Sequence, residues 1–211
     1  LQGDLNSTTG KPLMDLKSKD RPPGFWPVFK GESFDLWMPE TGTYYAWADP
    51  KKVLPNLQQK RLRGGRSKNS PFSEFDPKWV RDPNTLPCLG PRVAFRRISR
   101  ATDTRTIRVA LVPPELISTD VAPYFLWPRG SAADEALLLG VMSSLILDWY
   151  ARRFVETHMD FHVVDPLPVP RPPVDHPLRR RAVALAGRLA SPDDRLAAWA
   201  KEAGVACGPR A

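Results

Sequence analysis

Basic side chains gather in two segments, and their type and spacing give the clearest chemical signal in the sequence. Residues 51–68 contain seven lysines and arginines and no acid, whereas residues 92–108 contain six arginines and one acid, Asp103. Arginine binds phosphates in a bidentate manner and also reaches base edges. The whole chain has a formal net charge of +8. This charge favours a polyanionic partner, nucleic acid first and an anionic membrane second.

The first basic segment has the composition of a flexible loop. It contains Arg63-Gly64-Gly65-Arg66-Ser67, in which the glycines free the backbone. Such a loop can bind phosphates. The alternative is a solvated surface loop that binds no ligand. The candidate phosphate contacts are Lys60, Arg61, Arg63, Arg66 and Lys68.

The second basic segment predicts a hairpin. Residues 92–98 and 105–113 both alternate apolar with polar side chains, and the polar stretch 99–104 between them is typical of a turn. We expect an antiparallel pair of strands with arginines at its tip, where side chains can enter a groove of a duplex. A polar hairpin on an edge strand, with charges that block aggregation, is the alternative. The candidate base or groove contacts are Arg96, Arg97, Arg100, Thr102, Thr104 and Arg105.

The remaining sequence predicts the frame that positions these residues. Residues 25–31 and 122–127 favour short strands, and residues 44–47 form a further aromatic cluster. Packing of these rings in the core is favoured over stacking on bases. A long helix is expected after Ser131, with Leu138, Met142, Leu145 and Trp149 as its buried stripe. A strand at 161–164 and a run of prolines lead into two further helices, at about 177–190 and 192–203.

Length and composition set the fold class. The chain has 211 residues, 42% of them hydrophobic and 26% charged, which are ordinary globular values and argue against disorder. Its 24 prolines favour short elements and irregular connections. We therefore expect a mixed α+β fold with small antiparallel or mixed sheets on a central buried helix. Residues 1–173 are expected to form a recognition domain, and residues 174–211 a helical hairpin packed on it.

No familiar catalytic or metal-binding motif is present. The sequence lacks a glycine-rich phosphate loop, HExxH and GxSxG. The three histidines have no nearby cysteine or aspartate that would complete a metal site, and Cys88 and Cys207 are expected to be reduced thiols. The longest apolar stretch, 136–147, is shorter than the roughly 20 residues that a bilayer crossing needs. We assign no catalytic residue, no metal ligand and no membrane partner.

A joint pattern of segments supports a more specific expectation. The segments are Pro27–Glu32, Arg92–Arg100 with Thr102–Thr106, Ala110–Pro114, Leu139–Arg153 with Thr157–Phe161, and Leu167–Pro170. Taken in order, they resemble the C-terminal target-recognition region of adenine-N6 DNA methyltransferases with the TaqI-like layout. The related fused restriction–modification enzymes and phage-defence methylases share this region. The resemblance covers about residues 1–173.

The resemblance implies the specificity half of a larger cytoplasmic protein. In that family a separate N-terminal methyltransferase domain binds S-adenosylmethionine and carries an Asn/Asp-Pro-Pro-aromatic catalytic motif, which Arg21-Pro22-Pro23-Gly24-Phe25 does not match. The chain would bind double-stranded DNA, hold no cofactor itself and cooperate with that domain, which flips and methylates an adenine. Two alternatives remain: a non-sequence-specific nucleic-acid-binding or scaffold module, and an enzyme with an unfamiliar site.

Overall fold

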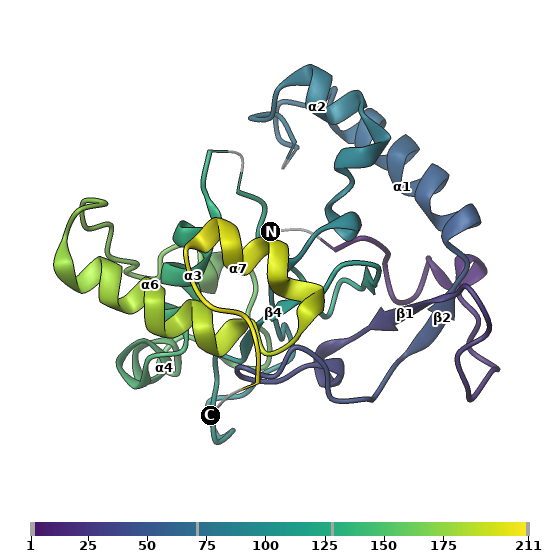
Figure 1. The fold of residues 1–211 in the computed structure, drawn as a ribbon. Helices are drawn as coiled ribbons and strands as arrows, with labels where there is room; N and C mark the ends of the chain where they lie inside the picture. The colour runs from purple at the N-terminus through teal and green to yellow at the C-terminus, as the bar shows by residue number, and fades with distance from the viewer. Residues whose placement is uncertain (1–2, 71, 128, 210–211) are drawn as a thin grey trace.

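Two small β-sheets frame the computed structural model, which describes residues 3–70, 72–127 and 129–209; β4 lies near the centre of Figure 1, and β1 and β2 lie to its right. The strands are β1 (Trp26–Phe29), β2 (Ala46–Ala48), β3 (Arg92–Phe95), β4 (Val109–Val112) and β5 (Ile117–Ser118). One sheet has the order β2-β1-β5, in which β2 is antiparallel and β5 parallel to β1. The other is the antiparallel pair β3-β4, with Arg92 opposite Val112. The predicted hairpin strands are therefore confirmed.

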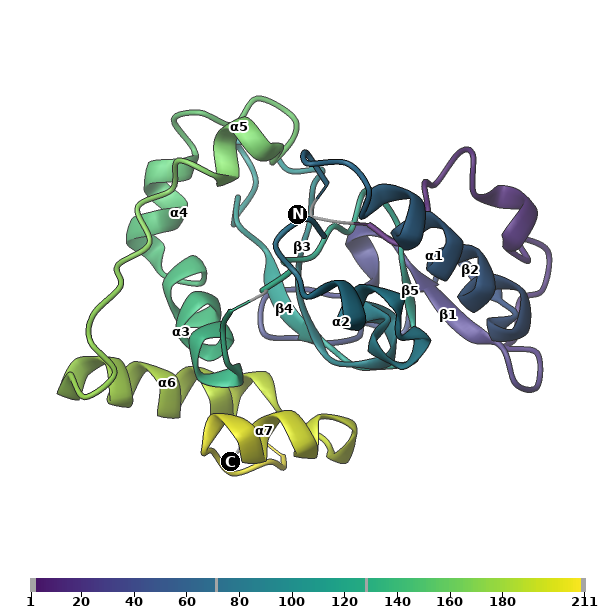
Figure 2. The same cartoon turned by 90° about the horizontal axis from the view of Figure 1, so that it is seen from above.

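Seven α-helices surround the sheets in the described residues, so the expected α+β class is confirmed. They are α1 (Pro50–Gly64), α2 (Pro77–Arg81), α3 (Ala132–Met142), α4 (Leu145–Ala151), α5 (Phe161–Val164), α6 (Pro177–Ala190) and α7 (Ala197–Ala203). In Figure 2, α1 lies along the β1-β2-β5 sheet, and α3, α6 and α7 lie on the other side of β3-β4. The β3-β4 sheet is buried on both faces, because Val93 and Leu111 pack towards α3 while Ala94 and Ala110 pack towards β1.

The first basic segment is mostly helix, which corrects the expected loop. The Asp49 side chain caps α1 by accepting a hydrogen bond from the Lys51 amide at 3.0 Å. Val53, Leu57 and Arg61 follow at intervals of four residues and form the buried face of the helix. Pro55 stands inside the helix and lies on its exposed side.

The long helix predicted after Ser131 is two helices. The first helix begins after Ser131 as expected, and Ser131 and Asp134 form a capping box there. The helix ends at Met142, and the Ser144 side chain accepts a hydrogen bond from the Leu147 amide at 3.2 Å to begin α4. The change of direction exposes Trp149 to 62%, so the predicted buried stripe is wrong beyond Met142.

Two predicted strands are also wrong. Residues 161–164 form the short helix α5, and within 122–127 only Tyr124 pairs, through a single bridge to Ala94. The helices after the proline run are confirmed at Pro177–Ala190 and, after a 3-10 turn, at Ala197–Ala203. Both contact α3. At the crossing of α3 and α6, a Cβ added at Gly140 would lie 3.2 Å from the Ala186 Cβ, so the two helices meet closely there.

A buried ion pair joins the N-terminal segment to both sheets. The Asp4 carboxylate accepts hydrogen bonds from Arg92 Nη1 at 2.7 Å, from the Ser118 amide at 2.8 Å and from the Tyr124 hydroxyl at 2.8 Å. The three donors come from β3, from β5 and from the segment after β5. Within the described ranges, no helix is both long and apolar enough to cross a bilayer.

Candidate nucleic-acid interface

The loop between β3 and β4 presents polar side chains to solvent. Arg100, Thr102 and Thr104 are all exposed. The loop begins beside the segment before α5, because the Met159 amide donates to the Arg97 carbonyl at 2.7 Å and the Ser99 amide donates to the Thr157 carbonyl at 3.2 Å. We refer to residues 99–106 as the hairpin loop.

Two side chains on or next to α4 hold the backbone of the hairpin loop. The Arg152 guanidinium donates to the carbonyls of Ala101, Asp103 and Thr104 at 3.2, 2.8 and 2.6 Å. Asp148 accepts a hydrogen bond from Arg152 Nε at 3.0 Å, so the two residues act as one unit. We refer to Asp148 and Arg152 as the clamp.

The carboxylate of the clamp also fixes the end of the loop. Asp148 is buried and accepts the amides of Thr106 and Ile107 at 2.8 and 2.7 Å. Within the loop, the Ser99 hydroxyl donates to the Thr106 carbonyl at 2.6 Å. Because carbonyls and amides along the loop have fixed partners, its conformation is preformed and its exposed side chains are carried on an ordered backbone.

Three predicted groove contacts are engaged within the protein. Arg96 donates to the Phe34 carbonyl at 2.9 Å and pairs with Asp35 at 3.2 Å. Arg105 donates to the Ser143 carbonyl at 2.7 Å and lies 3.3 Å from an Asp148 oxygen. These contacts position the hairpin. They also use N–H donors of both guanidinium groups, so few donors are left for a base.

Arg97 is the third engaged arginine. Its Nε lies 2.6 Å from an Asp160 carboxylate oxygen, and Nη1 lies 3.6 Å from Asp120. The hydrogen bond with Asp160 raises the pKa of Arg97, and the same contact lowers the pKa of Asp160. Both groups are therefore charged at neutral pH, and the pair joins β3 to the start of α5.

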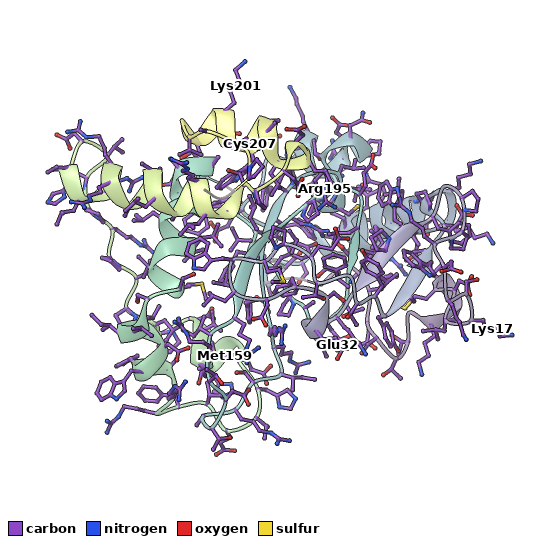
Figure 3. All side chains as sticks on the ribbon, turned by 60° about the horizontal axis from the view of Figure 1, so that its bottom comes forward. Lys17, Glu32, Met159, Arg195, Lys201 and Cys207 are labelled. Carbon is purple, nitrogen blue, oxygen red and sulfur yellow. The ribbon has the colours of Figure 1, made fainter. Side chains whose placement is uncertain are left out.

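A cleft of about 660 Å³ brings one residue of each predicted set together. Its lining consists of Gly3, Leu5, Asn6, Lys60, Phe95, Arg97, Asp120, Pro123, Met159, Asp160 and His162. Figure 3 labels Met159, one of the lining residues, and shows that it lies far from Lys201 and Cys207 of the C-terminal segment. Lys60 donates to the carbonyls of Asp4 and Gly3 at 2.8 and 3.1 Å, and burial lowers its pKa.

The exposed basic residues continue along α1 beyond Lys60. Arg63 lies about one turn further on, and Arg66 and Lys68 follow the end of the helix. All three are exposed. In the part of the chain that the structure describes, the side chains of Arg66 and Lys68 make no hydrogen bond or ion pair. Arg63, Arg66 and Lys68 are therefore available for phosphates, whereas the Lys60 ammonium already donates to two backbone carbonyls and keeps one N–H for a further acceptor.

Arg61 is not available, and its assignment as a phosphate contact is wrong. Its exposed fraction is 2%, and its guanidinium donates to the Thr85 carbonyl at 2.9 Å and to the Gln58 Oε1 at 2.6 Å. It also donates to the Asp82 carbonyl and lies over the Trp79 ring at 5.1 Å from its centroid. Arg61 holds α1 against the segment that contains α2.

The clamp is the functional feature that sequence reasoning missed. Asp148 and Arg152 are separated by four residues, which places them on one side of a helix where an ion pair forms readily. This spacing could have singled them out. The residues around Asp148 and Arg152 are mostly apolar, however, and this composition predicts a helix that serves packing alone.

Other candidate chemistry is sparse in the described ranges. No group of three or more histidine, cysteine, aspartate or glutamate side chains is placed to hold a metal ion there. Cys88 is buried, Cys207 is half-buried, and neither forms a disulfide. Comparison with known proteins adds no relative, because no family model, no curated protein and no solved structure matches the chain.

Proposed function

We propose that this chain recognises a specific sequence in double-stranded DNA. The observation that carries the proposal is the hairpin loop, an ordered backbone that presents Arg100, Thr102 and Thr104 to solvent. Arginine reads guanine through two hydrogen bonds in the major groove, and threonine contacts either base edges or the thymine methyl group. A preformed loop binds with a smaller loss of conformational entropy than a mobile one.

Contacts with phosphates are separate from base recognition. Residues of α1 and of the turn after it make them. Lys60, Arg63, Arg66 and Lys68 supply charge without sequence information, as backbone contacts do. If all four neutralise phosphates, the logarithm of the binding constant falls with the logarithm of salt concentration with a slope of about −3.6. Lys60 lines the same cleft as Arg97, next to which the hairpin loop begins.

The wider proposal follows the sequence resemblance. The chain acts as the specificity part of an adenine-N6 DNA methyltransferase or restriction–modification protein, in the cytoplasm. A separate N-terminal domain of the same parent protein binds S-adenosylmethionine and carries out methyl transfer. The support is the ordered arrangement of the matching segments, since Arg92–Phe95, Asp148, Arg152 and Met159 all take part in holding the hairpin.

A non-sequence-specific nucleic-acid-binding or scaffold module is the second candidate. It is favoured by the internal pairing of Arg96, Arg97 and Arg105, which leaves Arg100 as the exposed arginine of the hairpin loop. A single exposed arginine reads fewer base pairs than four would. The number of base-pair positions at which the chain discriminates between bases therefore decides between the two candidate functions.

Selection from a library of duplexes with a random 12-base-pair core separates the two functions. We expect the purified chain to enrich one short motif, and competition by single-stranded DNA or double-stranded RNA to be weak. Binding without enrichment would support the second candidate, and absence of binding to any duplex would remove both nucleic-acid proposals. Arg153→Ala serves as a charge control, because Arg153 is exposed and lies outside the proposed contacts.

A further inference from the structure

Large apolar side chains are exposed together on α4 and α6. The exposed fractions are 82% for Ile146, 62% for Trp149 and 58% for Leu185. They line a groove of about 610 Å³ between the two helices, with Trp37, Pro168 and Pro170 among its other walls. Contiguous exposed apolar surface of this kind marks an interaction site in soluble proteins. None of these residues takes part in the proposed DNA contacts.

The shape of the groove fits a helix. Its walls are mostly helical: α6 forms one side, α4 and the end of α3 form the other, and Pro168 and Pro170 of the segment before α6 complete the lining. A helix laid in such a groove presents apolar residues at positions i, i+3 or i+4, and i+7. α6 has 14 residues and is therefore about 21 Å long. A partner helix of up to about four turns can lie along α6, and α4, with seven residues, is long enough to contact about two of these turns.

The charges around the groove select the partner. Arg181 and Arg188 are exposed and are the i−4 and i+3 neighbours of Leu185 on α6, so both lie beside the apolar face. On the other wall, Arg153 lies over the Trp149 ring at 5.4 Å from its centroid. The sequence of α6 contains no acid, and the one acid in α4, Asp148, is buried in the clamp.

We propose that this groove binds an amphipathic helix of another protein or domain, with an apolar stripe flanked by aspartates or glutamates. A second copy of this chain fits less well, since pairing two such grooves brings arginines on α6 and after α4 towards each other. A membrane surface fits less well, because insertion needs a projecting apolar face, whereas these side chains line a concave groove. The proposal does not depend on DNA binding.

The test uses the full chain and a phage-displayed library of random 16-residue peptides. We expect the enriched peptides to share helically spaced apolar residues with acidic neighbours. A synthetic representative should bind with a dissociation constant that rises at least about tenfold with Ile146→Ser. Arg181→Glu combined with Arg188→Glu should weaken the acidic peptide about tenfold and strengthen its lysine-substituted counterpart. Lys201→Glu, on exposed α7 surface, is the matched control and should leave both unchanged.

Four results of the peptide experiments would overturn the proposal. They are a library without enrichment, enriched peptides that lack acids, peptide binding that Ile146→Ser does not alter, and an effect of Lys201→Glu equal to that of the α6 variants. Sedimentation that shows a dimer dissociated by Ile146→Ser would assign the groove to self-association. Binding to vesicles of phosphatidylcholine and phosphatidylserine, lost in Ile146→Ser and not displaced by the peptide, would assign it to a membrane surface.

Discussion

Two arginines on α1, only two residues apart, have different roles because one is buried and the other exposed. Arg61 lies inside the molecule, where its guanidinium satisfies carbonyls of the segment after α2, whereas Arg63 faces solvent. A buried charge without partners is costly, and so are carbonyls left without donors. Charge counts along the sequence therefore overestimate the surface available to a polyanion.

Arg61→Ala is expected to lower the free energy of unfolding by about 3 kcal/mol, because several buried acceptors lose their donor at once. Chemical denaturation measures this change. Arg63→Ala, at an exposed position of the same helix, should alter stability by less than about 0.5 kcal/mol. An Arg61→Ala variant as stable as the wild-type chain would contradict the structural role of the residue.

Arg63→Ala should instead affect binding. We expect it to weaken all duplexes by the same factor and to reduce the magnitude of the salt slope by about 0.9, the contribution of one phosphate contact. Titrations at several salt concentrations with two unrelated duplexes measure both quantities. A loss confined to one duplex would show that Arg63 reads sequence and would contradict its assignment.

Glu135 gives stability a pH dependence. It accepts a hydrogen bond from Trp199 Nε1 at 2.6 Å, and burial raises its pKa from 4.5 to about 7. A raised pKa in the folded state favours the protonated form, so this contribution to stability is complete below about pH 4.5 and is lost as the pH rises to about 7.

The matching variant is Glu135→Gln, which keeps an oxygen acceptor for Trp199 but does not titrate. Relative to this variant, the wild-type chain should lose up to about 3 kcal/mol of unfolding free energy between pH 4.5 and pH 7. Denaturation curves for both proteins across this range give the difference. Parallel curves would mean that Glu135 ionises as freely in the folded chain as in the unfolded one.

At the scale of elements, the clamp connects α4 to the hairpin loop. Arg152→Lys keeps the charge but cannot reach three carbonyls with a planar fork of donors. We expect the amides of residues 100–106 to exchange hydrogen about tenfold faster in this variant, because the loop opens more easily. Hydrogen-exchange mass spectrometry or nuclear magnetic resonance measures the rates.

The neighbouring residue provides the control for the clamp. Arg153 is exposed, and its contact is with the Trp149 ring on α4 rather than with the loop. Arg153→Lys should therefore leave the exchange of residues 100–106 unchanged. Equal rates in the wild-type chain and in Arg152→Lys would show that other contacts suffice to order the loop.

Elements with strong local signals were predicted correctly. The alternating strands of the hairpin, the start of α3 after Ser131 and the Pro177 start of α6 all follow from neighbouring residues. Elements decided by distant contacts were not. α1 contains a proline but is stabilised by burial of Val53 against the first sheet. The end of α3 is different, because the local signal of Ser143 and Ser144 is hidden inside an apolar run that continues on both sides.

At the scale of the whole molecule, the candidate site was only partly predictable. The sequence located the basic segments and the exposed loop residues Arg100, Thr102 and Thr104. It could not show which arginines pair internally, since Asp35 and Asp160 lie far from Arg96 and Arg97 in the chain. Nor could it show the groove of α4 and α6, because exposure depends on the break after Met142.

The most direct test of the account is the specificity ratio, the affinity for the selected duplex divided by that for a scrambled duplex at one salt concentration. For the wild-type chain we predict a ratio of at least about 10³. Arg100→Ala should lower it about 5- to 150-fold, the equivalent of 1–3 kcal/mol at one base pair, with binding to the scrambled duplex unchanged. A wild-type ratio near one, or an equal loss on both duplexes, would contradict sequence-specific recognition by the hairpin loop.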